Sequence, residues 1–171
     1  MANPPYSPII FIGREKEVKL FERMLDNQEA QWILNLYGEG GMGKTQLLRR
    51  FAEIAKQHRN TLVTADLIDF YWTAHQRELG ILKSIADQLA PKQFGPFYTT
   101  LHKYQQLLDQ AEPPDPIYLH DQSMKARSQF IEVYKELAAD RIVLLFDTAE
   151  VASETAIRFW QELLPILSRS Q

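Results

Sequence analysis

One stretch of eight residues, Gly38-Glu39-Gly40-Gly41-Met42-Gly43-Lys44-Thr45, limits what this chain can fold into more than any other. Four of its eight positions are glycine, which lets the backbone bend tightly and leaves its N–H groups unobstructed. An apolar run at 32–37 precedes the stretch and predicts a buried strand, whereas Leu47 and Phe51 after it have helical spacing. A strand, a glycine-rich turn and the N-terminus of a helix together favour the binding of an anion such as phosphate.

The spacing of the first and last of these glycines, with Lys-Thr directly after, fits the phosphate-binding loop of nucleotide-binding proteins. We expect the Lys44 ammonium to lie on the β- and γ-phosphates and the Thr45 hydroxyl to bind Mg²⁺. The alternative is a glycine-rich turn that ends in Lys-Thr by chance, and the flanking strand and helix disfavour it. The loop residues predicted to bind the nucleotide are Gly38, Glu39, Gly40, Gly41, Met42, Gly43, Lys44, Thr45 and Gln46.

Composition narrows the remaining choices. The 171 residues suffice for one domain with a sizeable core. The absence of cysteine excludes disulfides and cysteine catalysis, and it fits a reducing compartment, so we expect the protein in the cytoplasm. A net charge of −3 argues against a surface that attracts nucleic acid throughout. No apolar run is long enough to cross a membrane, and we expect no membrane association.

The order of apolar runs and helical patterns predicts the architecture. Residues 1–8 form an extended lead-in, and 9–171 form the N-terminal part of a nucleotide-binding domain. The expected elements are a helix from Glu15 to about Asn27, a strand at 32–37, a helix at 44–57, a strand at 61–67, a helix at 76–89, an inserted helix and proline-rich loop at 91–120, a helix capped by Asp121 and running to Ala139, a strand at 141–147, and a helix capped by Ser153 that Pro165 kinks or ends. Apolar strands that alternate with helices predict an α/β fold, a parallel β-sheet with helices on both faces.

Two carboxylates follow the last of these strands. Ligands of parallel sheets bind at the carboxyl ends of the strands, so Asp147 and the loop at 38–45 open on the same edge. We predict that Asp147 contributes to catalysis by reaching the Mg²⁺ held by Thr45; the alternative is that it begins a turn or caps a helix. Glu150 is predicted to accept a proton from the attacking water or to orient it, and its alternative is a solvated loop glutamate.

Three segments resemble the nucleotide-binding domain of the STAND signal-transduction ATPases, AAA+-related switch proteins that include the NACHT and NB-ARC groups. The segments are Phe11-Ile12-Gly13-Arg14-Glu15, the loop at 38–45 and the run from Val143 to Glu150. The resemblance covers about 9–150. It implies that Phe11, Ile12, Gly13 and Arg14 lie beside the adenine and ribose. It also implies slow hydrolysis, a cycle between ADP-bound rest and ATP-bound assembly of several copies, and regulatory or sensor domains further along the chain.

The chain departs from that family at two points. Thr148 and Ala149 separate Asp147 from Glu150, whereas the family's second acidic residue often follows the metal aspartate directly. The family also has a further strand between those at 32–37 and 141–147, then another strand and a helical lid. We therefore expect a truncated P-loop NTPase sheet, a fragment of a longer polypeptide. The alternative is direct pairing of 32–37 with 141–147, as in phosphate-loop kinases and GTPases.

Other functions fit the same nucleotide residues. One is an AAA+-type ATPase driven by nucleic acid, which the acidic charge disfavours. Another is a P-loop phosphotransferase with 91–120 as a substrate lid and a substrate hydroxyl held by Asp66 or Asp69. A third is a nucleotide-binding module that never hydrolyses. The leading prediction remains a Mg²⁺-dependent switch ATPase that binds ATP and ADP.

Overall fold

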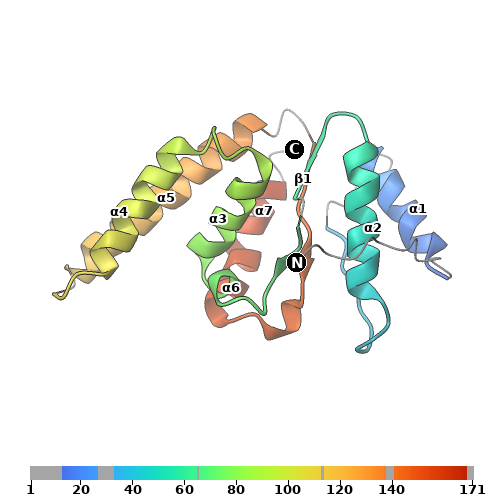
Figure 1. Cartoon of the computed structure of the whole chain (residues 1–171), viewed down its shortest axis with the longest axis horizontal. Coiled ribbons are helices and arrows are strands. Elements are labelled where there is room, and N and C mark those ends of the chain that lie inside the picture. The colour runs from blue at the N-terminus through green and yellow to red at the C-terminus, as the bar shows by residue number, and fades with distance from the viewer. Residues whose placement is uncertain (1–12, 27–32, 65, 113, 138–140, 169–171) are drawn as a thin grey trace, which may run out of the picture.

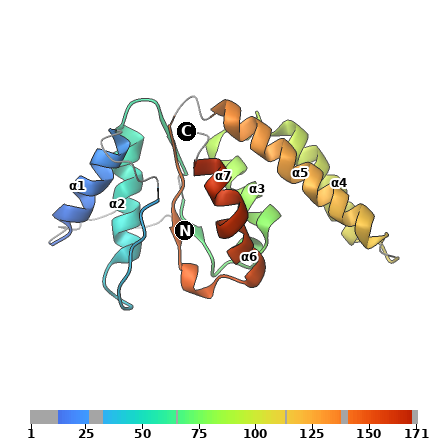
Figure 2. The same ribbon diagram turned by 180° about the vertical axis from the view of Figure 1, so that it is seen from behind.

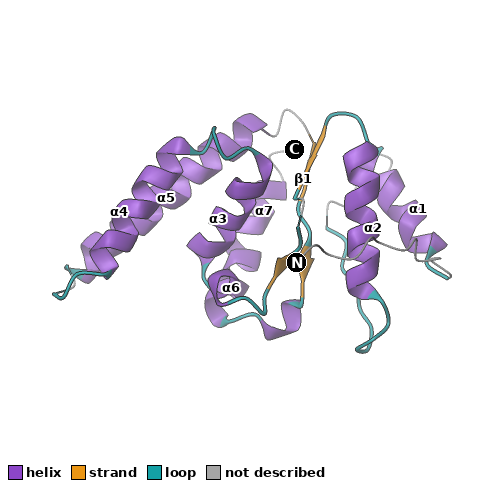
Figure 3. Cartoon of the chain, viewed as in Figure 1, coloured by secondary structure: helices purple, strands orange, loops and turns teal. Residues whose placement is uncertain are grey.

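The computed structural model describes residues 13–26, 33–64, 66–112, 114–137 and 141–168. Its helices are α1 (Glu15–Leu25), α2 (Lys44–Gln57), α3 (Glu78–Leu89), α4 (Gly95–Leu108), α5 (Pro116–Leu137), α6 (Glu154–Arg158) and α7 (Leu164–Ser168). The strands are β1 (Thr61–Val63), β2 (Ile68–Asp69), β3 (Arg141–Val143) and β4 (Phe146–Asp147), and short turns of other helix types are η1 (Thr73–Gln76), η2 (Ala149–Val151) and η3 (Phe159–Leu163). The strands lie between α1 and α2 on one side and α3, α6 and α7 on the other (Figures 1 and 3). This layering confirms the α/β arrangement with helices on both faces.

All strand pairs in the described residues are parallel, as the sequence predicts. β1 pairs with β3 and β2 pairs with β4. The strand predicted at 141–147 is therefore broken into two short pieces, whereas the strand predicted at 61–67 is formed only at 61–63 and β2 follows directly after its predicted end. Between the pairs Val63↔Val143 and Ile68↔Phe146, residues 64–67 connect β1 to β2 whereas residues 144–145 connect β3 to β4. The β1–β2 side therefore has two more residues than the β3–β4 side. The buried Thr64 hydroxyl spans this irregularity by accepting a hydrogen bond from the Leu145 N–H at 3.2 Å. A bulge of this kind bends the sheet just before its carboxyl edge.

The prediction of a strand at 32–37 is wrong for the part of this segment that the structure describes, residues 33–37. Residues 33–37 are extended but belong to no strand, and no described pairing joins them to β3 or β4. Leu34 and Leu36 face the core beside α1 and α2, whereas Ile33 and Tyr37 are 46% and 86% exposed. A mostly apolar cleft of about 650 Å³ lies between this segment and β3–β4. Direct pairing of the two segments is also wrong, because the cleft occupies the place where a neighbouring strand would supply hydrogen-bond partners.

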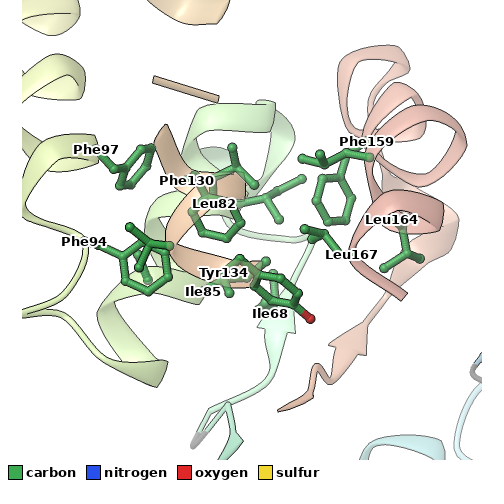
Figure 4. Packing of buried hydrophobic residues seen from close by; sticks show 14 of the residues in the cluster. Ile68, Leu82, Ile85, Phe94, Phe97, Phe130, Tyr134, Phe159, Leu164 and Leu167 are labelled. Carbon is green, nitrogen blue, oxygen red and sulfur yellow. The ribbon is translucent and has the colours of Figure 1, made fainter. Parts of the chain in front are cut away.

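Two hydrophobic cores flank the strands. The smaller one joins α1 to α2, where the rings of Phe21 and Phe51 stack with centroids 4.2 Å apart. The larger one joins α3, α5 and the C-terminal helices, and its members interdigitate as Figure 4 shows. Its largest side chains are Ile68, Phe70, Ile81, Leu82, Ile85, Phe94, Phe97, Phe130, Tyr134 and Phe159. The periodic apolar residues of α1, α2 and α3 point into these cores, which confirms those helices.

The predicted insert at 91–120 forms half of a helical hairpin. α4 and α5 lie side by side and extend away from the strands in both views (Figures 1 and 2). α5 begins at Pro116, five residues before the predicted start, so the cap predicted at Asp121 is wrong. The Asp115 carboxylate accepts a hydrogen bond from the Ile117 N–H at 2.7 Å, and Pro116 is pre-organised for the first helical position.

The C-terminal helix starts where the sequence indicates, but it does not end at Pro165. The Ser153 hydroxyl accepts a hydrogen bond from the Ala156 N–H at 3.2 Å and so caps α6, as predicted. The chain stays helical through Pro165 to Ser168, but the turn before it, η3, is a π-helix. Wider i→i+5 bonding accommodates the proline, which has no N–H to donate. None of the helices in the described part of the chain combines the length and apolarity that spanning a bilayer requires.

Candidate nucleotide-binding site

The glycine-rich loop leads directly into α2, as its sequence predicts. Gly43 has φ 80° at the N-cap of α2, a left-handed conformation that costs a residue with a side chain strain. Gly38 has φ 155°, a conformation that residues with side chains rarely adopt, and a Cβ atom there would also come within 2.9 Å of the Met42 sulfur, which would have to shift. Two of the glycines are therefore required by the shape of the loop itself.

Lys44 folds back across this loop. Its Nζ donates hydrogen bonds to the carbonyl oxygens of Gly38 at 2.8 Å and Glu39 at 3.1 Å. The first N–H groups of a helix lack helical acceptors, and the positive end of the helix dipole lies at the same point. The loop therefore brings an ammonium group to the start of α2, where the positive end of the helix dipole lies, an arrangement suited to a polyphosphate.

Thr45 and Asp147 meet at the carboxyl edge of the strands. The Thr45 hydroxyl donates to Asp147 Oδ2 at 2.7 Å, although 102 residues separate the two in sequence. Asp147 Oδ1 accepts a second hydrogen bond, from the Thr148 N–H at 3.0 Å. A hydroxyl and a carboxylate are hard oxygen donors of the type that Mg²⁺ binds, usually with phosphate and water completing its shell. The residues at this point thus fit the ion that the sequence predicts.

Glu150 lies in η2, on the rim of the large cleft. Lys44, Asp147 and the loop glycines line the same cleft. The Glu150 side chain is exposed, and it makes no hydrogen bond or ion pair with the described part of the chain. Thr148 has φ 55°, so the chain turns sharply between Asp147 and Glu150. The structure therefore brings Glu150 to the same rim as the loop, and its catalytic role stays a prediction.

Arg14 connects the N-terminal segment to the loop. Its Nη2 donates to the Met42 carbonyl oxygen at 3.0 Å, and its Nη1 lies 2.6 Å from Glu17 Oε1. The hydrogen bond from Arg14 lowers the pKa of the Glu17 carboxyl. Gly13 precedes this contact in a left-handed conformation, with φ 88°. The predicted nucleotide-side residues Phe11 and Ile12 lie outside the described residues.

Two further side chains support the site: Gln76, which sequence reasoning missed, and Asp69, for which it predicted only the binding of a substrate hydroxyl. Asp69 ends β2 directly opposite Asp147 in the ladder, and the Thr148 hydroxyl donates to its Oδ1. Gln76 Nε2 donates to the Val151 carbonyl at 3.1 Å, and its Oε1 accepts from the Ser153 N–H at 2.6 Å. An aspartate at the carboxyl end of a second apolar strand was the available signal for Asp69. Asp66, its predicted companion, is exposed.

Comparisons with known proteins agree with this geometry. A family model described as "AAA ATPase domain" matches residues 10–171. An uncharacterised ATP-binding protein of Methanocaldococcus jannaschii is 33% identical over 57 residues, which is 33% of this chain and 95% of that protein. No solved structure matches the chain. The family model spans nearly the whole sequence, and the phosphate loop and strand-end aspartate of this chain meet as described. The chain therefore belongs to the AAA ATPase domain family.

Proposed function

We propose that this chain binds ATP and ADP at residues 38–46 and hydrolyses ATP in the presence of Mg²⁺. The observation that carries the proposal is the 2.7 Å contact between the Thr45 hydroxyl and the Asp147 carboxylate beside the mouth of the loop. It joins the two chemical parts that phosphoryl transfer requires, a phosphate cradle and an oxygen site for a metal. Family membership and the ATP-binding relative support the same proposal.

Each residue has a distinct part in this reaction. The α2 amides and the Lys44 ammonium stabilise negative charge on the β- and γ-phosphates. Thr45 and Asp147 hold Mg²⁺, which neutralises charge on the phosphate oxygens when bound. Glu150, which lines the same cleft as Lys44 and Asp147, orients the attacking water or accepts its proton. Arg14 contacts the loop through the Met42 carbonyl, and the proposal assigns Arg14 and Gly13 to the binding of the base and ribose.

We further propose that the chain is part of a signal-transduction switch of the STAND type that works in the cytoplasm. Its slow hydrolysis is coupled to regulatory domains and to self-association in the ATP-bound form. The exposed and unpartnered state of Glu150 among the described residues supports slow turnover, because nothing there fixes its carboxylate. The apolar cleft supports an additional extended segment beside β3–β4, as expected for the N-terminal part of a larger domain. Nothing in the described site favours the nucleic-acid motor or the phosphotransferase over the switch.

The test combines binding and turnover. Titration calorimetry with ATP and ADP in the presence of Mg²⁺ is expected to give saturable binding, and phosphate release is expected to be slow. Lys44→Ala should weaken ATP binding by about two orders of magnitude, consistent with loss of a charge-assisted contact worth about 2–3 kcal/mol. Lys56→Ala, at the other end of the same helix, is the matched control and should bind as wild type. Unchanged affinity in the Lys44 variant would refute the proposal.

A further inference from the structure

Two aspartates end neighbouring strands at the same level. Asp69 of β2 and Asp147 of β4 are register partners, and the Phe70 N–H donates to the Asp147 carbonyl at 3.2 Å. Adjacent strands of a sheet lie about 4.8 Å apart, so the two carboxylates begin side by side at the edge where the loop opens. Asp147 is engaged by Thr45 and by the Thr148 amide. Asp69 has a different set of partners.

The Asp69 carboxylate holds the turn that follows Asp147. Its Oδ1 accepts hydrogen bonds from the Thr148 hydroxyl and from the Tyr71 N–H, the latter at 2.9 Å. Thr148, with φ 55°, is one of two non-glycine residues in the described chain with positive φ. A β-branched residue is disfavoured in this left-handed region, so a specific interaction has to hold it there. The hydrogen bond from its own side chain to Asp69 is that interaction.

The segment that carries Glu150, residues 148–153, is also held at its C-terminal end by the connection between β2 and α3. Gln76, in the turn between β2 and α3, binds Val151 and Ser153 through its side-chain amide. The Ser153 hydroxyl returns a hydrogen bond of 2.5 Å to the Gln76 carbonyl. Residues 148–153, which carry Glu150, are therefore fixed at both ends by residues 69–76. Glu150 itself has no such brace among the described residues.

We propose that Asp69 is a positioning residue for hydrolysis. By holding Thr148 in the left-handed conformation, it turns the chain so that Glu150 faces the cleft and the phosphate loop. The inference rests on the proposed function, because it assigns Asp69 a part in presenting Glu150 to the reacting phosphate. In the described contacts the Asp69 carboxylate binds Tyr71 and Thr148 rather than the loop or Lys44, so we expect its replacement to leave nucleotide affinity nearly unchanged.

The experiment uses Asp69→Ala in the full chain and separates kcat from KM. A positioned acid–base group contributes about 10²–10⁴-fold to rate, and a displaced one loses a large part of this, so kcat should fall about 30-fold. The KM for ATP and the Kd for ADP should stay within about twofold of wild type. Asp69→Asn keeps the Oδ1 acceptor and should retain most of the turnover. A second, more polar pocket is lined by Asp69, Thr45 and Asp147, and Glu53 of α2 lines it as well, so Glu53→Ala is the matched control for loss of a carboxylate there.

A rescue experiment separates positioning from direct chemistry. Glycine adopts the left-handed conformation without help, so in a Thr148→Gly background Asp69→Ala should reduce kcat by no more than about twofold. An equal loss in both backgrounds would overturn the proposal, since Asp69 would then act on the reaction directly. Unchanged kcat in Asp69→Ala would overturn it as well. So would a parallel loss of nucleotide affinity and thermal stability, which indicates a purely structural role.

The two proposals also fail in different ways. If the wild-type chain binds ATP without turning it over, hydrolysis is refuted, and the hydrolytic role of Asp69 is refuted with it. If the chain hydrolyses ATP, the conformation of Thr148 tests the Asp69 inference alone: its backbone ¹³C shifts in Asp69→Ala should move away from those of positive φ. Retention of the left-handed shifts would overturn the inference while leaving the proposed function intact.

Discussion

Replacement of Thr45 by valine tests the central contact of the site. Valine keeps the size and β-branching of threonine but removes the hydroxyl that donates to Asp147 Oδ2 at 2.7 Å. Hydrogen bonds to a charged group contribute about 1.5–3 kcal/mol, and partial exposure of this pair puts the expected loss near the lower end, at about 1–2 kcal/mol. For a chain of this length each kcal/mol lowers Tm by about 2–4 °C, so we expect a decrease of about 2–8 °C.

The same substitution should separate metal-dependent from metal-independent binding. Loss of one Mg²⁺ ligand is expected to weaken ATP binding in Mg²⁺ by about tenfold and to leave binding of ADP in EDTA within about twofold. Differential scanning fluorimetry and calorimetric titration measure the two effects. Thr45→Ser, which keeps the hydroxyl, should bind as wild type, and Thr99→Val, which removes an exposed helix hydroxyl, controls for a general effect of valine. Equal ATP affinity with and without Mg²⁺ in both wild type and Thr45→Val would refute the metal role of this pair.

Three further predictions concern the rest of the molecule. Phe130→Ala, in the aromatic cluster between α4 and α5, should lower the free energy of unfolding by about 3–5 kcal/mol in denaturant titration, and a loss below 1 kcal/mol would contradict the packing described. Burial raises the pKa of the Glu78 carboxyl above 4.5 despite its neighbour Arg127, so the folded chain binds that proton more tightly than the unfolded one. The free energy of unfolding should therefore fall as pH rises from the pKa of Glu78 in the unfolded chain to its pKa in the folded chain. Glu78→Gln should flatten the pH profile of Tm over that range, and an unchanged profile would refute this. A short Val/Ile-rich strand fused through a flexible linker should enter the apolar cleft beside β3–β4, reduce the fluorescence of an added hydrophobic dye and raise Tm, whereas the same fusion with aspartates at alternate positions should do neither.

The parts of the fold that depend on local pattern were predictable. The loop at 38–45 and helix α2 follow from glycine placement and helical spacing over a few turns. Ser153 was found as a cap because capping needs only a hydroxyl and the next three residues. The start of α5 was missed for a local reason too, since Pro116 suits the first position of a helix as well as it suits a loop.

The parts that depend on distant neighbours were not predictable in the same way. Residues 33–37 have the composition of a strand, but a strand forms only where another strand supplies its hydrogen bonds. The bond between Asp69 and Thr148 depends on the register of β2 against β4 and on the bulge before it, neither of which a single sequence specifies. The approach of Asp147 to Thr45 was foreseen only because the topology of parallel sheets places both on one edge.

The hairpin of α4 and α5 connects the nucleotide cleft to a distant part of the molecular surface. Tyr134, near the C-terminal end of α5, lines that cleft and also packs on Phe130, with ring centroids 5.9 Å apart. From Tyr134 to Ile117 at the distal end, 17 residues of α5 extend over about 26 Å, and Ile117 is 71% exposed. A rotation of about 10° at Tyr134 would carry the distal end through about 4–5 Å, by simple leverage on a rod of that length. A small rotation at the cleft would thereby become a displacement of nearly one helix turn at the outer end of the hairpin.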